Sequence, residues 1–197
     1  MRSDNRGVVS LEPNSLADVW SDIECVARAL DVPERGKELV ARLQKRMDEI
    51  ARRATGATTR PTVGLVEWIE PLMTAGHWMP ELVGFAGGIS VFGQPNQPAP
   101  RITWQQLVAA DPQVIIAQPC GFDMERTRQE MAALTKKPEW SNLQAVRSGK
   151  VFVTDGNQFF NRPGPRLVES LEILAEILHP ELFDFRHRGV GWDVFAT

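Results

Sequence analysis

Residues 103–122, TWQQLVAADPQVIIAQPCGF, contain a capped helix, a turn, a strand and a glycine-containing loop in immediate succession. Thr103 and Gln106 have the spacing of a capping box, so we expect a helix over 103–109. An Asp-Pro turn then leads into a strand over 114–117. This succession is the building block of α/β proteins.

The same alternation of strand and helix patterns continues on both sides of this stretch. Further strands are expected at 62–66, 90–92 and 151–154, and further helices at 80–86, 123–134 and 165–178. Strands that alternate with helices at this spacing predict a mostly parallel sheet with helices on both faces. The fold class is therefore α/β, with a three-layer Rossmann-like lobe.

The chain before this lobe has a different pattern. GVVSL at 7–11 predicts a short strand, and Asn14 or Ser15 begins a helix that ends near residue 32. A long helix follows over 33–53. Its narrow apolar stripe consists of Leu39, Leu43, Met47 and Ile50. We expect this helix to lie across another element, preceded by an orphan β–α unit that has no sheet of its own.

Composition excludes several classes of protein. The chain has 197 residues, 43% of them hydrophobic, and a net charge of −3 without blocks of like charge, so we expect no nucleic-acid partner. Cys25 and Cys120 lie far apart and are expected to be free thiols. We expect no membrane helix, which needs about 20 apolar residues, and no signal peptide, because the charged first residues precede no apolar stretch.

The loops that follow three predicted strands carry large aromatic residues beside glycine and proline. In an open parallel sheet, ligands bind beyond the carboxyl ends of the strands, and three aromatic loops at one edge predict a wide, flat, apolar ligand surface. The candidate ligand-binding residues are Glu67, Trp68, Met73, His77 and Trp78 after the first strand, Cys120 and Phe122 after the third, and Asn157, Phe159, Phe160 and Arg162 after the fourth.

Structural alternatives exist for several of these side chains. Trp68, Trp78, Phe159 and Phe160 are each also compatible with lids that close the core over the sheet edge. His77 fits a half-buried histidine as well as an axial metal ligand, and His179 and His187 do not form a cluster with it in the sequence. We therefore expect no metal site.

The motifs of common enzymes are missing from the sequence. It contains no nucleophile elbow, no phosphate-binding loop and no dinucleotide fingerprint. No histidine or aspartate is placed by sequence to activate Cys120, and Asp155-Gly156-Asn157 reads as a turn because the remaining calcium ligands are missing. Glu67 and Glu70 have no partner for acid–base catalysis. We expect the protein not to be an enzyme and to require no cofactor.

Several strings resemble one family of binding proteins. They are VSLEPNSL at 9–16, EW at 67–68 with PLM at 71–73, AGG at 86–88, ADPQVII at 110–116, PCGF at 119–122 and NRPGPR at 161–166. Together they resemble the BtuF-like substrate-binding proteins of ABC importers for cobalamin and iron siderophores. The likeness spans about residues 8–184, and PCGF and NRPGPR are its more specific strings.

The resemblance implies two α/β lobes joined by one long helix, with the ligand held between them. Residues 1–32 then resemble a remnant of an N-terminal lobe that is otherwise largely missing, 33–55 the connecting helix, 61–185 the C-terminal lobe and 186–197 a tail. The implied function is ABC-type uptake of cobalamin, or of haem or a ferric siderophore, with permease and ATPase subunits as partners. Members of the family are periplasmic or anchored outside the cell.

An alternative function comes from a different class. The orphan unit within residues 8–30 has the pattern of a segment that pairs with a second chain, which predicts a strand-exchanged homodimer without a ligand.

Overall fold

Five strands form one mixed sheet in the part of the chain that the structure, a computed structural model, describes: residues 8–195. They are β1 (Thr62–Val66), β2 (Ile89–Ser90), β3 (Val114–Ala117), β4 (Val151–Thr154) and β5 (Trp192–Val194), in the spatial order β2-β1-β3-β4-β5. The first four strands are parallel, and β5 is antiparallel to β4. The three central strands have the predicted bounds, whereas β2 begins one residue before the predicted 90–92.

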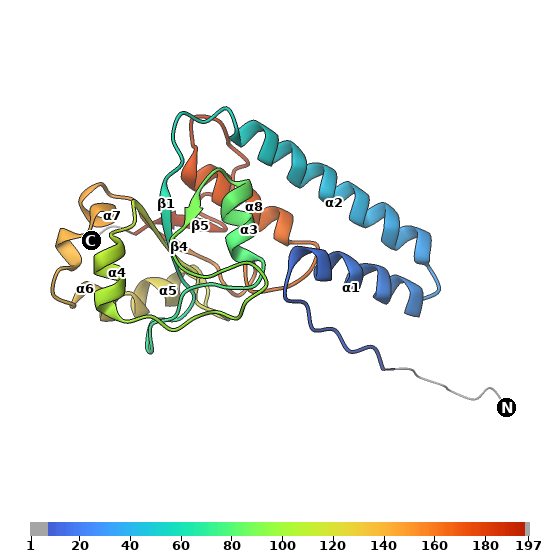
Figure 1. Cartoon of the computed structure of the whole chain (residues 1–197), viewed down its shortest axis with the longest axis horizontal. Helices are drawn as coiled ribbons and strands as arrows, with labels where there is room; N and C mark the ends of the chain where they lie inside the picture. Colours follow the sequence, from blue (N-terminus) through green and yellow to red (C-terminus); the bar gives the residue numbers. More distant parts are fainter. Residues whose placement is uncertain (1–7, 196–197) are drawn as a thin grey trace.

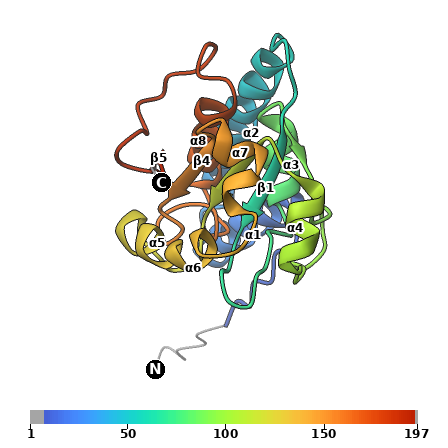
Figure 2. The same cartoon turned by 90° about the vertical axis from the view of Figure 1, so that its left-hand side faces the viewer.

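Helices cover both faces of this sheet (Figures 1 and 2). They are α1 (Leu16–Ala29), α2 (Pro33–Ala54), α3 (Met79–Phe85), α4 (Trp104–Ala110), α5 (Met124–Glu130), α6 (Ala132–Thr135), α7 (Gln144–Arg147) and α8 (Leu167–Leu178), with a 3₁₀ turn at Trp140–Asn142. One face packs against α3 and α8, and the other against the segment from α5 to α7. The predicted three-layer α/β class is thereby confirmed.

The pleat of the central strands separates the two cores. Leu65 and Ile116 face α3 and α8, whereas Val66 and Ile115 face the opposite layer. Because successive side chains of a strand point to opposite faces, a strand covered on both sides must be apolar throughout. The VIIA sequence of β3 meets this requirement, and all four of its residues are buried.

Helix caps follow the sequence closely. The Thr103 hydroxyl accepts the Gln106 N–H at 3.2 Å, and the Gln106 side chain accepts the Thr103 N–H at 2.7 Å, which completes the predicted capping box. Asp123 caps α5 by accepting the Arg126 N–H at 2.8 Å. The single helix predicted over 123–134 is interrupted at Met131 and forms α5 and α6.

The long helix α2 lies across the lobe, as predicted (Figure 1). It contacts α3 and α8 with the stripe that contains Leu43, Met47 and Ile50. The charged side chains of α2 lie on its other faces, which are exposed to solvent. No helix within residues 8–195 combines the length and the apolar character that a membrane crossing requires.

An apolar groove lies between α1 and α2. It measures about 470 Å³, and side chains of α1 and α2 line it together with Leu11, Pro13, Val32 and the segment 163–165. Val26 and Leu30 stand at this groove with 37% and 68% of their surface exposed. We call this feature the α1–α2 groove.

Two predictions at the ends of the chain are wrong. Residues 8–11 form no strand, and Val8 is 95% exposed; residue 7 lies outside the described range. No strand of the described chain lies beside this segment, and an isolated strand leaves its backbone groups without partners. The segment 186–197 is not a simple tail, because residues 192–194 form β5; residues 196–197 lie outside the described range.

Helix α8 carries two buried carboxylates. Only 3% of the surface of Glu172 and 4% of that of Glu176 is exposed, because α8 lies between the sheet and α2. A charge removed from water needs hydrogen-bonding partners. Glu172 receives Arg46 from α2 at 2.6 Å and the His187 Nε2 at 2.9 Å.

Glu176 binds the C-terminal segment. It accepts the Trp192 Nε1–H at 2.7 Å and backbone N–H groups of Phe185 and His187. The two carboxylates therefore attach α2 on one side and β5 on the other to the same helix.

We expect the contribution of His187 to stability to depend on pH. The hydrogen bond with Glu172 raises the pKa of His187 above its ordinary value of 6.5, although burial opposes this. The stabilisation is complete below the unfolded-state pKa and disappears as the pH rises through the higher folded-state pKa. His187→Gln should lower the free energy of unfolding by about 1–3 kcal/mol in mildly acidic buffer and by less in alkaline buffer. Urea denaturation across pH measures this, and a loss independent of pH would contradict it.

Leu171 tests the packing of α8 against the sheet. Its side chain is fully buried, so Leu171→Ala should lower the free energy of unfolding by about 2–5 kcal/mol. Leu30→Ala is the matched control, because Leu30 is 68% exposed, and it should change stability by less than about 1 kcal/mol. Equal losses in the two variants in urea denaturation would show that α8 does not form the core.

Candidate ligand-binding edge of the sheet

The loops that follow β1, β3 and β4 meet at one edge of the sheet. The Cys120 N–H donates to the Glu67 carbonyl at 3.3 Å, which joins the first two loops. The Asn157 N–H donates to the Phe122 carbonyl at 3.0 Å, which joins the second and third. The carboxyl ends of parallel strands lie at the same edge, and these hydrogen bonds hold the loops together there.

The turn after β4 brings its loop close to the loop after β3. One carboxylate oxygen of Asp155 accepts the Asn157 N–H at 3.0 Å and the Gln158 N–H at 2.7 Å, which forms an Asx turn. A Cβ at Gly156 would collide with the Pro119 carbonyl oxygen. Only glycine fits this close approach, and Asp155 serves the turn.

Trp68 is the aromatic side chain at the open part of the edge, and Phe122, only 8% exposed, lies beneath it. The rings of Trp68 and Phe122 have centroids 5.3 Å apart, and the guanidinium of Arg126 lies 3.8 Å from the centroid of the Phe122 ring. Trp68 is half-buried and donates its Nε1–H to the Glu70 carbonyl at 2.9 Å. We call Trp68, Phe122 and Arg126 the aromatic rim.

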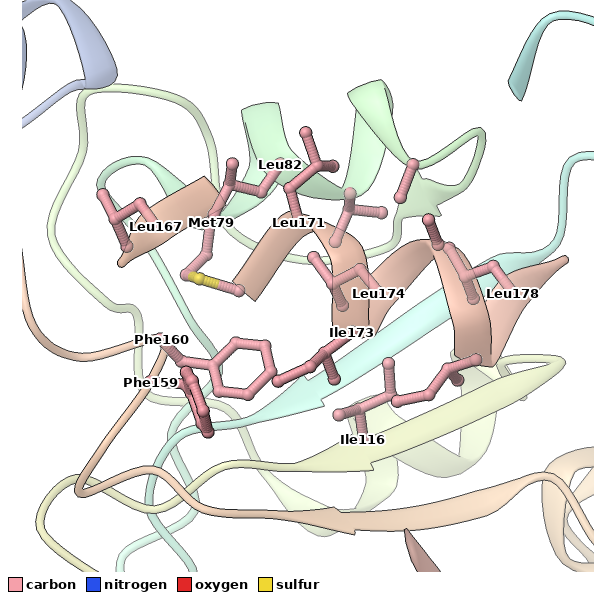
Figure 3. Packing of buried hydrophobic residues seen from close by; sticks show 14 of the residues in the cluster. Met79, Leu82, Ile116, Phe159, Phe160, Leu167, Leu171, Ile173, Leu174 and Leu178 are labelled. Carbon is pink, nitrogen blue, oxygen red and sulfur yellow. The ribbon is translucent and has the colours of Figure 1, made fainter. Parts of the chain in front are cut away.

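Three of the predicted ligand-facing aromatics belong to the core instead. Trp78, Phe159 and Phe160 are only 7%, 3% and 0% exposed. Figure 3 shows the two phenylalanine rings among core side chains of α8 and β3. The expectation that these rings offer free faces to a ligand is therefore wrong, and they support the edge from below.

Local backbone bonds explain why the phenylalanines turn inward. Phe160 has a left-handed backbone, with φ at 58°, and its N–H donates to the Ser170 hydroxyl of α8 at 2.9 Å. The Phe160 carbonyl accepts the Trp78 Nε1–H at 2.9 Å. The loop is thus bound to α8 and to the first loop, with its rings between them.

Met73 has a structural position in the first loop. It forms isolated bridges with Trp68 and Arg101, and its carbonyl accepts the Glu67 N–H at 2.9 Å. These backbone bonds fold the loop back on itself, and the Met73 side chain is half-buried.

A small cavity with polar and apolar lining residues lies beside the aromatic rim. It encloses about 170 Å³ and is lined by Glu67, Gly76, His77, Trp78, Met79, Cys120 and Asn161. A typical pocket for a whole ligand has roughly 300–1,000 Å³, so the cavity has room for a small substituent of a ligand and not for a macrocycle. We call it the Glu67–His77 cavity.

The carboxyl group of Glu67 has an unusual environment. The pKa of Glu67 is raised from 4.5 to about 7. Burial is the cause of the rise, and the smaller effect of the hydrogen bond with the Gly76 backbone opposes it. Glu67 is therefore divided between its acid and its carboxylate near neutral pH.

Two further polar side chains at this edge lack partners. Within residues 8–195, neither the Nδ1 atom of His77 nor the amide of Gln118 makes a hydrogen bond, and these atoms are buried. Gln118 itself is fully buried. More than nine in ten buried polar groups in folded proteins have partners, so this concentration of unpaired groups is unusual.

Asn157 and Arg162 lie apart from this cavity and bind each other. The guanidinium of Arg162 donates to the Asn157 backbone carbonyl at 3.0 Å and to its side-chain oxygen at 2.9 Å. Both residues line a separate shallow depression together with the segment 163–166. The third loop thus presents two surfaces, and only Asn161 faces the cavity.

The predicted site is therefore brought together in part. Glu67, His77 and Cys120 share the cavity, and Trp68 and Phe122 form the rim beside it. Among the described residues no group of histidine, cysteine, aspartate or glutamate has the geometry to hold a metal ion. Both cysteines are free, with Cys120 exposed and Cys25 half-buried.

Sequence reasoning did not select Gln118 and Asn161. A signal was present for Gln118, because it follows the wholly apolar VIIA strand directly and so stands at the carboxyl edge of the sheet. The position of Asn161 depends on hydrogen bonds from its side-chain nitrogen to the carbonyls of Gln118, at 2.9 Å, and Gly156, at 3.2 Å.

Known proteins resemble this chain in sequence and in fold. A vitamin B12-binding protein of Vibrio cholerae is 24% identical over 174 residues, which are 85% of this chain and 58% of that protein. An ABC transporter substrate-binding protein from Listeria monocytogenes has a TM-score of 0.76 at 20% identity, covering 87% of this chain and 67% of the other. A periplasmic heme-binding protein from Pseudomonas aeruginosa has a TM-score of 0.74 at 20% identity, covering 93% and 66%.

The chain spans little more than half the length of the vitamin B12-binding relative that it matches. The two solved structures establish the likeness of fold. The model of the family described as Periplasmic binding protein matches residues 3–158. Since this match includes well over half of the chain, the protein belongs to the periplasmic binding protein family.

Proposed function

We propose that the chain acts in ABC-type uptake, as the C-terminal lobe and connecting helix of a substrate-binding component. In this proposal α2 is the connecting helix and residues 61–185 are the lobe. The ligand is cobalamin or a similar metal chelate, such as haem or a ferric siderophore. The partners are permease and ATPase subunits, and the protein captures and releases its ligand without covalent chemistry.

The aromatic rim is the observation that carries this proposal. Trp68 stands half-buried over Phe122 at the carboxyl edge of the sheet, in a chain of the periplasmic binding protein family. An aromatic side chain with an open face binds a flat, largely apolar ligand by stacking and by removal of apolar surface from water. The buried Phe159 and Phe160 keep the edge rigid beneath it.

Rigidity matters for the affinity of such a surface. Ordering a loop when a ligand binds costs free energy, and the hydrogen bonds among the three loops have already ordered these. The ligand therefore meets a preformed edge, which supports a role in capture.

We expect Trp68→Ala to weaken ligand binding by about tenfold or more, the effect of losing a stacking aromatic side chain. The measurement is titration with cyanocobalamin, haem and a ferric hydroxamate, followed by absorbance. The far-ultraviolet circular dichroism of the variant should be unchanged, since Trp68 lies at the edge of the core.

Trp20→Ala is the matched control for this prediction. Trp20 is also half-buried, but it lines a depression between α1, α2 and α3, so its loss should leave affinity within about twofold. Equal affinity of Trp68→Ala and the wild type would show that the rim does not bind the ligand. Failure of the wild type to bind any of the three chelates would overturn the proposed function.

A second candidate function is self-association through residues 8–30. The α1–α2 groove favours it, because an exposed apolar groove with Val26 and Leu30 at its margin is typical of a protein–protein contact. In this candidate the contact is made by helix side chains, since residues 8–11 form no strand for exchange.

Light scattering separates the two candidates. A homodimer would have twice the chain mass of 22.0 kDa, and Leu30→Glu would return it to the monomer by placing a charge in the apolar contact. A wild-type mass of one chain at all concentrations would exclude the second candidate.

A further inference from the structure

The Glu67–His77 cavity has a different chemical character from the aromatic rim. Glu67, His77, Cys120 and Asn161 give it polar atoms at the point where the three loops meet. The rim fits the face of a flat ligand. The cavity has room for a substituent at the border of that ligand, and its polar atoms determine which substituent fits.

Gln118 lies behind the lining of this cavity: it is fully buried, and its backbone carbonyl accepts the side-chain N–H of the lining residue Asn161 at 2.9 Å. It stands beside Glu67 in the sheet, since Val66 is paired with Ala117 and the Gln118 N–H donates to the Val66 carbonyl at 2.8 Å. Leu65 and Ile116, two positions before them, share one face of the sheet, so Glu67 and Gln118 also share it. The amide of Gln118 has one oxygen and one NH₂ group to offer.

Backbone hydrogen bonds hold His77, which lines the cavity. Its N–H donates to the Gln97 carbonyl at 2.6 Å and its carbonyl accepts the Asn96 N–H at 3.2 Å. Its φ of 53° is left-handed, a conformation that costs about 1–3 kcal/mol for a residue other than glycine. This backbone keeps the unpaired Nδ1 atom at the cavity.

Asn161 provides a further acceptor. Its side-chain nitrogen is occupied by the carbonyls of Gln118 and Gly156, so the oxygen remains for another partner. The cavity thus combines acceptors and donors within a few side chains. No lysine or arginine is among its lining residues.

The lack of a lining cation determines which substituents fit. A carboxylate would meet Glu67 without a positive charge to compensate, and burying like charges together is costly. A primary carboxamide is neutral and offers both a donor and an acceptor, as the unpaired groups require.

We propose that the Glu67–His77 cavity is a subsite for an uncharged primary carboxamide at the periphery of the ligand, and that it discriminates against peripheral carboxylates. This inference rests on the proposed function and specifies its ligand class. It favours a chelate that carries carboxamides, as corrinoids do, over one that carries propionates, as haem does.

The first experiment compares cyanocobalamin with its monocarboxylic acids, in which one peripheral carboxamide is hydrolysed. At an alkaline pH, where Glu67 is ionised, the wild type should bind at least one of these acids about tenfold or more weakly than cyanocobalamin. Glu67→Gln should reduce this ratio to less than about threefold, because the like charge is removed. The variant retains His77 and Cys120, the other ionisable groups of the cavity, so the comparison isolates Glu67.

Mildly acidic buffer provides a second readout. The pKa of Glu67 is about 7, so its repulsion of a carboxylate should decline as the pH falls below that value. The discrimination ratio of the wild type should fall with it, and that of Glu67→Gln should change less. A ratio that stays constant across pH would overturn the assignment of Glu67.

Gln118→Leu separates a binding role from a structural one. Replacing an unpaired buried amide with an apolar group of similar size removes a desolvation cost, so the Tm of the free protein should stay the same or rise. Affinity for cyanocobalamin should nevertheless fall by about tenfold. A lower Tm with unchanged affinity would show that Gln118 serves the fold alone.

The outcomes distinguish failure of the subsite from failure of the function. Equal binding of cyanocobalamin and all of its monocarboxylic acids, or tighter binding of haem, would overturn the subsite while leaving metal-chelate capture in place. No binding of any chelate by the wild type would overturn both.

Discussion

The pairing of two buried carboxylates on α8 is the constraint on which the rest of the structure depends. Glu172 holds Arg46 of α2 and His187, and Glu176 holds Trp192 of β5. Leaving either carboxylate unpaired in the interior would cost several kcal/mol, so α2, α8 and the C-terminal strand are bound to one another. The start of α8 in turn fixes Phe160 through Ser170. The edge of the sheet that carries the rim and the cavity is thus supported by interactions at the opposite side of the helix.

The edge divides two tasks between neighbouring groups. In the proposed function the aromatic rim offers apolar area to a flat ligand, and such area distinguishes flat ligands poorly. In the proposed subsite, the polar atoms of the cavity are what distinguish one substituent from another. Both depend on the same loops, because the Glu67 carbonyl binds Cys120 and the Gln118 carbonyl binds Asn161. The sheet edge is therefore a single preformed surface with an apolar part and a polar part.

Local patterns were sufficient to predict the central strands and the helix caps. VIIA at 114–117 is apolar throughout, and Thr103 with Gln106 forms a cap that involves neighbours in sequence only. Interactions between distant segments were not predictable in this way. β5 is a three-residue WDV strand held by Glu176, and the inward turn of Phe159 and Phe160 follows from a bond to Ser170. Position after a strand correctly placed Glu67, Trp68 and Cys120 at the edge, but it could not distinguish a ring that faces solvent from one that faces α8.

The sheet ends on both sides in very short strands, with two residues in β2 and three in β5. A strand edge attracts other chains through its row of free N–H and C=O groups, and these edges offer few of them. The short edge strands β2 and β5 of the described chain therefore disfavour the pairing of this sheet with sheets of other molecules. A lobe built in this way can leave an aromatic surface open without an adjacent template for aggregation.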